Sequence, residues 1–159
     1  MFCVLVTDCG GSAGSGHSQS SPSPALTAAT ACTLVSATDV SGAFHQQFPA
    51  GSKASADGEI DNECLFRMGD LGQNGIVAIE VVFGDMASRF YENGQQKLTG
   101  LAPVSGVGDK AVLKTDGSAI LAIKGQIAVF VTALLSDETA ADRGNGCVLL
   151  VNLVFSKTS

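Results

Sequence analysis

Residues 118–135 read Ser118-Ala-Ile-Leu-Ala-Ile-Lys-Gly-Gln-Ile-Ala-Val-Phe-Val-Thr-Ala-Leu-Leu135, two apolar runs separated by the turn pair Gly125-Gln126. Runs of this length, rich in Ile, Val and Ala and bounded by turn residues, are typical of buried β-strands. A third such run ends at Leu113, just before the tight turn Thr115-Asp-Gly117. The pattern therefore predicts a three-strand antiparallel meander.

A second β-rich region lies upstream of the meander. It consists of Cys64–Met68 and Ile76–Phe83, joined by a loop that contains Asn74-Gly75. Two β-rich runs around an Asn-Gly turn predict a hairpin. Strand alternation places four apolar residues of the second run on one face, namely Val77, Ile79, Val81 and Phe83. Glu80 points to the opposite face and marks it as the wetter one.

Two helices are indicated around the hairpin. Ser36 is a good N-cap, and the acid three residues later favours the positive end of a helix dipole. This first helix is predicted to end near Phe48, because Pro49 follows. Asp85 predicts the start of a second helix, with Phe90 on its inner stripe.

Residues 136–155 fit two interpretations. Apolar residues recur at helical spacing, but Arg143-Gly-Asn-Gly146 would interrupt a helix, and Val148–Phe155 would also suit a strand. We favour a helix. The fold class expected from the whole pattern is α+β, with an antiparallel five-stranded sheet (hairpin plus three-strand meander) and two or three helices packed on a face.

The first 28 residues differ in composition from the rest. Residues 1–9 end at Cys9 and look like the tail of a lipoprotein signal peptide, although Asp8 stands where a small neutral residue is expected. Residues 10–28 are predicted to be a disordered tether, because twelve of the fifteen residues 10–24 are Gly, Ser or Pro. Residues 29–159 are expected to form a single α+β domain.

Composition excludes several function classes. The net charge of −6 gives a surface that repels phosphate backbones, so no nucleic-acid partner is expected. The cysteines are Cys3, Cys9, Cys32, Cys64 and Cys147, and none form a CxxC pair. Neither a metal site nor a cofactor is therefore predicted.

Three stretches occur in a familiar order. They are Cys32-Thr-Leu-Val-Ser-Ala-Thr-Asp-Val-Ser-Gly-Ala-Phe44, Cys64-Leu-Phe66 and Val104-Ser-Gly-Val-Gly-Asp-Lys-Ala111. Together they resemble a family of small secreted lipoproteins, common in actinobacteria and known only as a domain of unknown function. The likeness covers residues 9 to about 135.

The resemblance implies a location and a covalent bond. It implies lipidation at Cys9 and a disulfide between Cys32 and Cys64, and it supplies no catalytic residue. The chain departs from the family in Asp8, in the short apolar run before Cys9, and in the additional Cys147, which we expect to be a buried thiol.

The most distinctive exposed stretch is the Gly-rich loop before the meander. It lacks the spacing of a phosphate-binding loop, and we expect its glycines to be turn residues with positive φ and its aspartate to bond local backbone amides. It is our first candidate for a loop that contacts a partner, through Ser105, Gly106, Gly108, Asp109 and Lys110.

Two other groups of residues have plain structural explanations. His45 is expected to be a surface histidine, and His17 lies in the tether. Acidic residues alternate before the hairpin, at Asp57, Glu59, Asp61 and Glu63. Clustered carboxylates suggest a calcium site, but the EF-hand pattern is missing. Alternating acids also suit an exposed strand edge, where they prevent pairing with another strand.

Three functions are consistent with these observations. The first is a non-enzymatic binding domain at the outer face of the plasma membrane, held there by the lipid anchor alone or secreted, with an unknown protein or small apolar ligand as partner. The second is a carrier of a small apolar ligand or lipid, bound in a gap under the helices between Ile76, Ala78, Val82, Ile120, Ala122 and Ala128. The third is a hydrolase built around His45.

Overall fold

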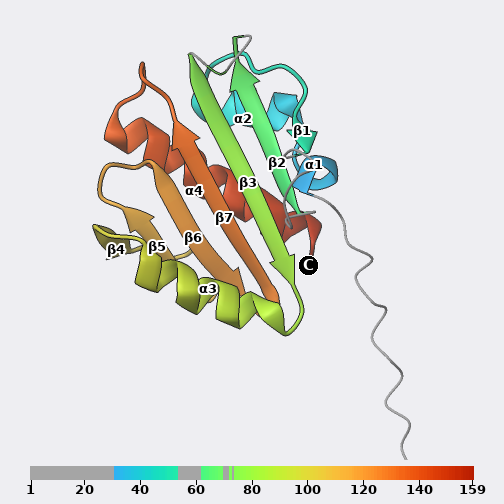
Figure 1. Cartoon of the computed structure of the whole chain (residues 1–159), viewed down its shortest axis with the longest axis vertical. Coiled ribbons are helices and arrows are strands. Elements are labelled where there is room, and N and C mark those ends of the chain that lie inside the picture. Colours follow the sequence, from blue (N-terminus) through green and yellow to red (C-terminus); the bar gives the residue numbers. More distant parts are fainter. Residues whose placement is uncertain (1–30, 54–61, 70–71, 73) are drawn as a thin grey trace, which may run out of the picture.

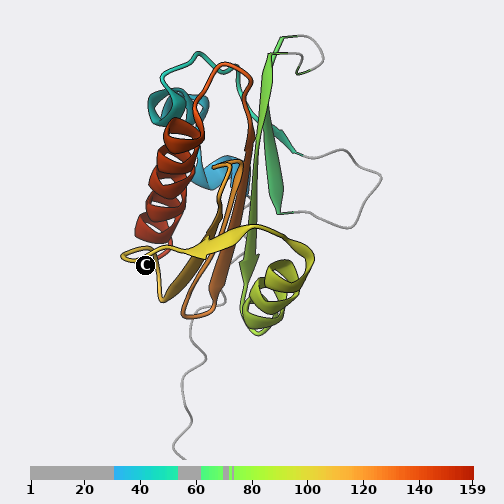
Figure 2. The same cartoon turned by 90° about the vertical axis from the view of Figure 1, so that its left-hand side faces the viewer.

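The fold is an open antiparallel sheet with helices on both faces (Figure 1, Figure 2). A computed structural model describes residues 31–53, 62–69, 72 and 74–159. The strands lie in the order β1-β2-β3-β7-β6-β5-β4. Their bounds are β1 Ser52–Lys53, β2 Glu63–Met68, β3 Gly75–Phe83, β4 Leu101–Pro103, β5 Lys110–Lys114, β6 Ala119–Lys124 and β7 Ile127–Leu134.

The predicted hairpin and the predicted meander are both present, as β2–β3 and β5–β6–β7. They join along the long antiparallel pair β3–β7, in which Ile79 faces Val131. The α+β class is therefore confirmed, but the prediction of five strands is wrong. Six strands of three or more residues are described, and the two-residue β1 adds a seventh. The two additional strands are short edge strands, and Pro103 in β4 is tolerated because it lies at an edge.

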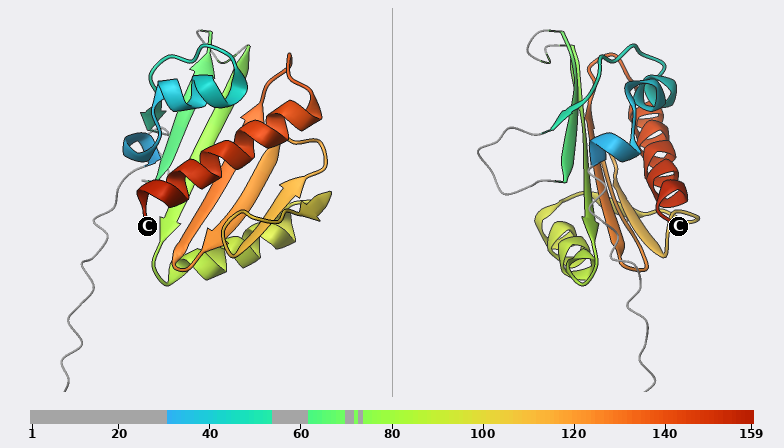
Figure 3. Two further views of the ribbon diagram at one scale, coloured as in Figure 1. Left: turned by 180° about the vertical axis from the view of Figure 1, so that it is seen from behind. Right: turned by 90° about the vertical axis from the view of Figure 1, so that its right-hand side faces the viewer.

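Helices α1 (Ala31–Leu34), α2 (Ala37–Phe44) and α4 (Ala140–Lys157) cover one face of the sheet (Figure 3). Helix α3 (Met86–Lys97) covers part of the other face. The expectation that all helices pack on one face is therefore wrong. Alternation explains the difference, because Leu121 and Ala128 belong to a separate apolar cluster from that of their strand neighbours Ile120 and Val129.

Helix α2 begins as predicted and ends early. The Ser36 hydroxyl accepts a hydrogen bond from the amide of Asp39, and the Asp39 carboxylate accepts one from the amide of Ser36, which completes a capping box. The helix ends at Phe44 rather than near Phe48, because His45 adopts a left-handed conformation with φ of 52°. Helix α3 begins directly after Asp85, as predicted, but the Asp85 side chain makes no capping hydrogen bond.

The favoured helix for residues 136–155 is confirmed as α4, capped by Thr139. The helix continues through its glycines, which allow it to approach other parts of the chain closely. A Cβ at Gly146 would overlap the ring of Phe44 and lie 3.0 Å from the carbonyl oxygen of Ala43. Glycine at this position therefore lets α4 cross α2 at short range.

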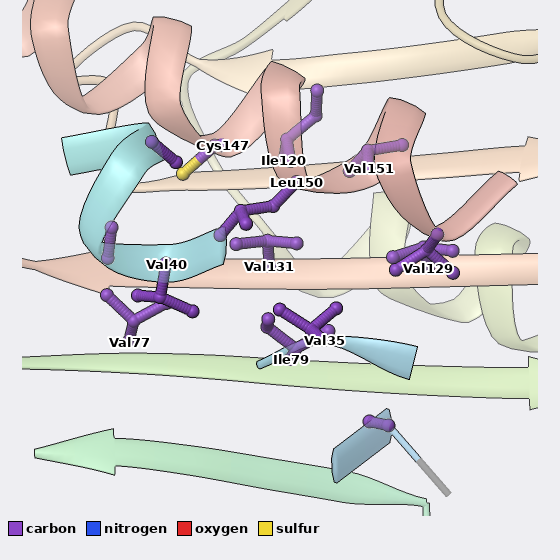
Figure 4. Close-up of a cluster of buried hydrophobic side chains, with 14 of the residues drawn as sticks. Val35, Val40, Val77, Ile79, Ile120, Val129, Val131, Cys147, Leu150 and Val151 are labelled. Carbon is purple, nitrogen blue, oxygen red and sulfur yellow. The ribbon is translucent and has the colours of Figure 1, made fainter. Parts of the chain in front are cut away.

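The main core lies between the sheet and the helices α1, α2 and α4 (Figure 4). Side chains from β3 and β7 meet Val35, Val40, Leu150 and Val151 there, and each is at most 1% exposed. Val35 and Val40 occupy the two positions of a hydrophobic staple on either side of the α2 cap, and both are buried. This face of the sheet is closed by apolar packing.

Candidate functional site

The opposite face of the sheet carries an apolar pocket beside α3. The cavity measures about 290 Å³, near the lower end of the roughly 300–1,000 Å³ typical of small-molecule sites. Its lining combines residues of α3 and the segment after it with one residue each from β3, β6 and β7. These are Glu80, Phe90, Asn93, Gly94, Lys97, Leu98, Leu121 and Phe130. We refer to this cavity as the α3 pocket.

Helical spacing brings the α3 residues to one side of the pocket. Phe90, Asn93, Gly94 and Lys97 follow the i, i+3, i+4, i+7 pattern and therefore form one stripe of the helix. Gly94 lies directly over Leu121, where a Cβ would come within 2.6 Å of the leucine Cδ2. The missing side chain therefore lets α3 approach β6 closely.

Glu80 is the acidic residue of the pocket lining, and it lies half-buried in β3. Its neighbours across the sheet are Glu63 of β2 and Phe130 of β7. Burial, with a further contribution from the Glu63 charge, raises the pKa of Glu80 to about 7. No hydrogen bond or ion pair joins the Glu80 carboxyl group to another described residue. The site therefore holds a carboxyl group that titrates near neutral pH among apolar walls.

The predicted contact loop lines a second cavity of about 510 Å³ on the other side of α3, together with Tyr91. Gly106 and Gly108 have φ of 78° and 58°, which confirms their predicted role as turn residues. The predicted bonding of Asp109 to local amides is wrong, because its carboxylate accepts a 2.7 Å hydrogen bond from the distant amide of Gly125. This bond ties the loop to the β6–β7 turn, while Ser105, Gly106, Gly108, Asp109 and Lys110 remain exposed.

The disulfide implied by the resemblance is present in the structure. The Sγ atoms of Cys32 and Cys64 lie 2.04 Å apart, and the bond links α1 to β2 across 32 residues. Cys147 is a buried free thiol, as expected, and burial raises its pKa to about 12.

The gap predicted under the helices is not the α3 pocket. The residues assigned to it do not share a face, since Ile120 and Ala122 belong to the main core whereas Val82 and Ala128 lie on the α3 side. Strand register is responsible. Ile120 of β6 pairs with Val131 of β7, a main-core residue, so even-numbered residues of β6 face the main core whereas Val82 of β3 faces α3.

Several predicted site residues lie outside the described residues, namely Cys9, His17, Asp57, Glu59 and Asp61. Glu63 is described, and the described part of the chain holds no group of three metal-binding side chains. His45 is exposed at the end of α2, and its side chain makes no hydrogen bond or ion pair to another described residue.

Comparison with known proteins supplies no relative from which a function could be transferred to the site. No family model, curated protein or solved structure matches the chain. Within the described ranges, no helix has the length and apolar character needed to cross a bilayer.

The α3 pocket was not predicted from the sequence. A glutamate in the middle of an apolar strand was the available signal for it, but Glu80 was interpreted only as a mark of the wetter face.

Proposed function

We propose that this chain is a non-enzymatic binding domain for a small, largely apolar ligand, working outside the cytoplasm and tethered to the membrane through a lipid on Cys9. The observation that carries the binding role is the α3 pocket, whose walls include Phe90, Leu98, Leu121 and Phe130. Apolar walls with a few polar groups are the usual composition of a small-molecule site.

The Cys32–Cys64 disulfide supports the location. Disulfides persist in oxidising compartments and are rare in the cytosol. This one joins the first helix of the described domain to the sheet, a few residues after the Gly/Ser/Pro-rich stretch that follows Cys9. A lipid on Cys9 would connect the domain to the membrane through the residues that precede Ala31, and two or more acyl chains suffice for stable anchoring.

The binding role is tested with N-phenyl-1-naphthylamine, a neutral apolar fluorophore whose emission rises in apolar surroundings. Asn93→Phe places a large ring at the α3 pocket and should abolish the emission increase. The matched control is Asn152→Phe, the same substitution at an exposed position of α4 on the opposite face. Equal binding by both variants would place the probe elsewhere and contradict the proposal.

The location is tested by mass spectrometry of native material. We expect Cys9 to carry an acyl-sized mass increase, Cys32 and Cys64 to be joined, and the protein to partition into detergent. A bare Cys9 together with free thiols at Cys32 and Cys64 would refute the tethered, extracytoplasmic assignment while leaving the binding role intact.

A further inference from the structure

We propose that the α3 pocket takes an amphiphilic ammonium compound, with its amine at the Glu80 carboxylate and its apolar chain against Phe90, Leu121 and Phe130. The inference rests on the proposed binding role, but it does not depend on the tether or the location. It names the chemical class of the ligand, which apolar walls alone leave open.

The charge of the site comes from two acids placed opposite each other. Glu63 and Glu80 are direct partners across the antiparallel pair β2–β3, so their side chains lie on the same face. Like charges directly opposite on a sheet are destabilising. Neither carboxylate forms an ion pair with a cation of the described part of the chain. A cationic ligand would remove this repulsion.

The other groups around Glu80 determine where the amine lies. Phe130 of β7 and Leu121 of β6 are apolar, and Glu63 is the charged group whose field acts on Glu80. Lys97 also lines the pocket, but it is exposed at the last turn of α3 and makes no ion pair with Glu80. The acidic part of the pocket is therefore at Glu80, and the apolar side chains beside it would hold the ligand's chain.

Binding of an ammonium group should be coupled to the ionisation of Glu80. A neighbouring cation favours the carboxylate, whereas the free site holds a proton below a pKa of about 7. An alkylammonium keeps its charge throughout this range, as a lysine does. The fraction of free protein with ionised Glu80 rises about 30-fold between pH 5.5 and 8.5, and the affinity for the cation should rise with it.

The test is isothermal titration calorimetry with n-octylamine, 1-octanol and octanoate at pH 5.5 and 8.5. We expect octylamine to bind at least tenfold more tightly than octanol at pH 8.5, to weaken about 30-fold at pH 5.5, and octanoate to bind most weakly. Glu80→Gln should remove the preference for the amine while octanol still binds. The matched control Glu92→Gln removes an exposed acid from α3 and should change none of these values.

The outcomes separate this inference from the proposed function. Equal affinities for octylamine and octanol, or an unchanged preference for the amine in Glu80→Gln, would overturn the ammonium assignment and leave an apolar site. Tighter binding of octanol than of octylamine would overturn it too, since Glu80 would then act as a protonated hydrogen-bond donor. If none of these compounds binds and the neutral fluorophore fails as well, the binding role itself is refuted.

Discussion

The two faces of the sheet differ in how completely helices cover them. On one face, α1, α2 and α4 cover side chains such as Val77, Ile79 and Val131, none of which has measurable exposure. On the other face, the 12-residue α3 covers only part of the sheet (Figure 1). The half-buried Glu80 and the α3 pocket lie on this face. Stability therefore resides mainly on the first face, and the proposed ligand site lies on the second.

The physical origin of the difference is helix coverage. Helix α4 has 18 residues and crosses the sheet together with α2, so apolar strand residues beneath them can be fully removed from water. Beyond α3 on the other face, Leu134 remains 57% exposed. The four predictions below test this contrast, from the largest expected change to the smallest.

Truncation of a buried side chain should distinguish the two faces most clearly. Leu150→Ala removes a fully buried leucine of the main core and should lower the free energy of unfolding by about 4 kcal/mol, through lost burial and the cavity that remains. Phe130→Ala removes a partly buried ring at the α3 pocket and should cost less than about 2 kcal/mol. Urea denaturation followed by far-UV circular dichroism measures both, and equal losses would contradict the contrast.

Removal of the disulfide should weaken the first face as well. The double substitution Cys32→Ser and Cys64→Ser opens a loop of 32 residues and should cost about 3–4 kcal/mol in the chain-entropy model. Differential scanning calorimetry of the variant and of the oxidised wild type measures the loss. The control is Cys147→Ser, which replaces a cysteine that forms no disulfide and so leaves the loop closed. A melting temperature unchanged on removal of the bridge would contradict its stabilising role.

Alanine at two helix glycines should affect stability differently on the two faces. Both substitutions gain up to about 1 kcal/mol of helix propensity. Gly146→Ala should nevertheless be destabilising by about 1–2 kcal/mol, because its Cβ meets the ring of Phe44 and the backbone of Ala43. Gly94→Ala meets only the end of the Leu121 side chain and should be close to neutral. Thermal unfolding measures the stability of both variants. A larger loss of stability in Gly94→Ala than in Gly146→Ala would contradict the contrast between the two faces.

The smallest effect concerns Glu80 and pH. Its pKa is raised from 4.5 to about 7 on folding, so the native state retains a proton that the unfolded state has already lost. The free energy of unfolding therefore falls as the pH rises from the unfolded-state pKa of 4.5 through the native pKa of about 7. Glu80→Gln should consequently be more stable than the wild type at pH 8, by about 1–2 kcal/mol after allowance for solvent screening, and equally stable below pH 4. A variant that is less stable at pH 8 would show that the ionised carboxylate is already well satisfied.

Local sequence patterns predicted much of the fold and little of the site. The N-cap at Ser36 and the turn at Gly117 depend on residues a few positions apart, and both are present as expected. The short strand β4 was missed because three residues that include Pro103 carry no periodic signal. The pocket was missed because its walls come from four separate segments of the chain.

The sequence by itself determined the five central strands and the positions of α2 and α3, because alternation, helical spacing and turn chemistry are properties of neighbouring residues. For α4 it left a strand as an alternative. Only the tertiary structure decided which face each helix covers, that Glu63 lies opposite Glu80, and that Gly94 lies over Leu121. These are relations between residues distant in the chain, fixed by strand register and by the packing of α3. The α3 pocket depends on them, and for this reason the candidate site could be located only in the folded chain.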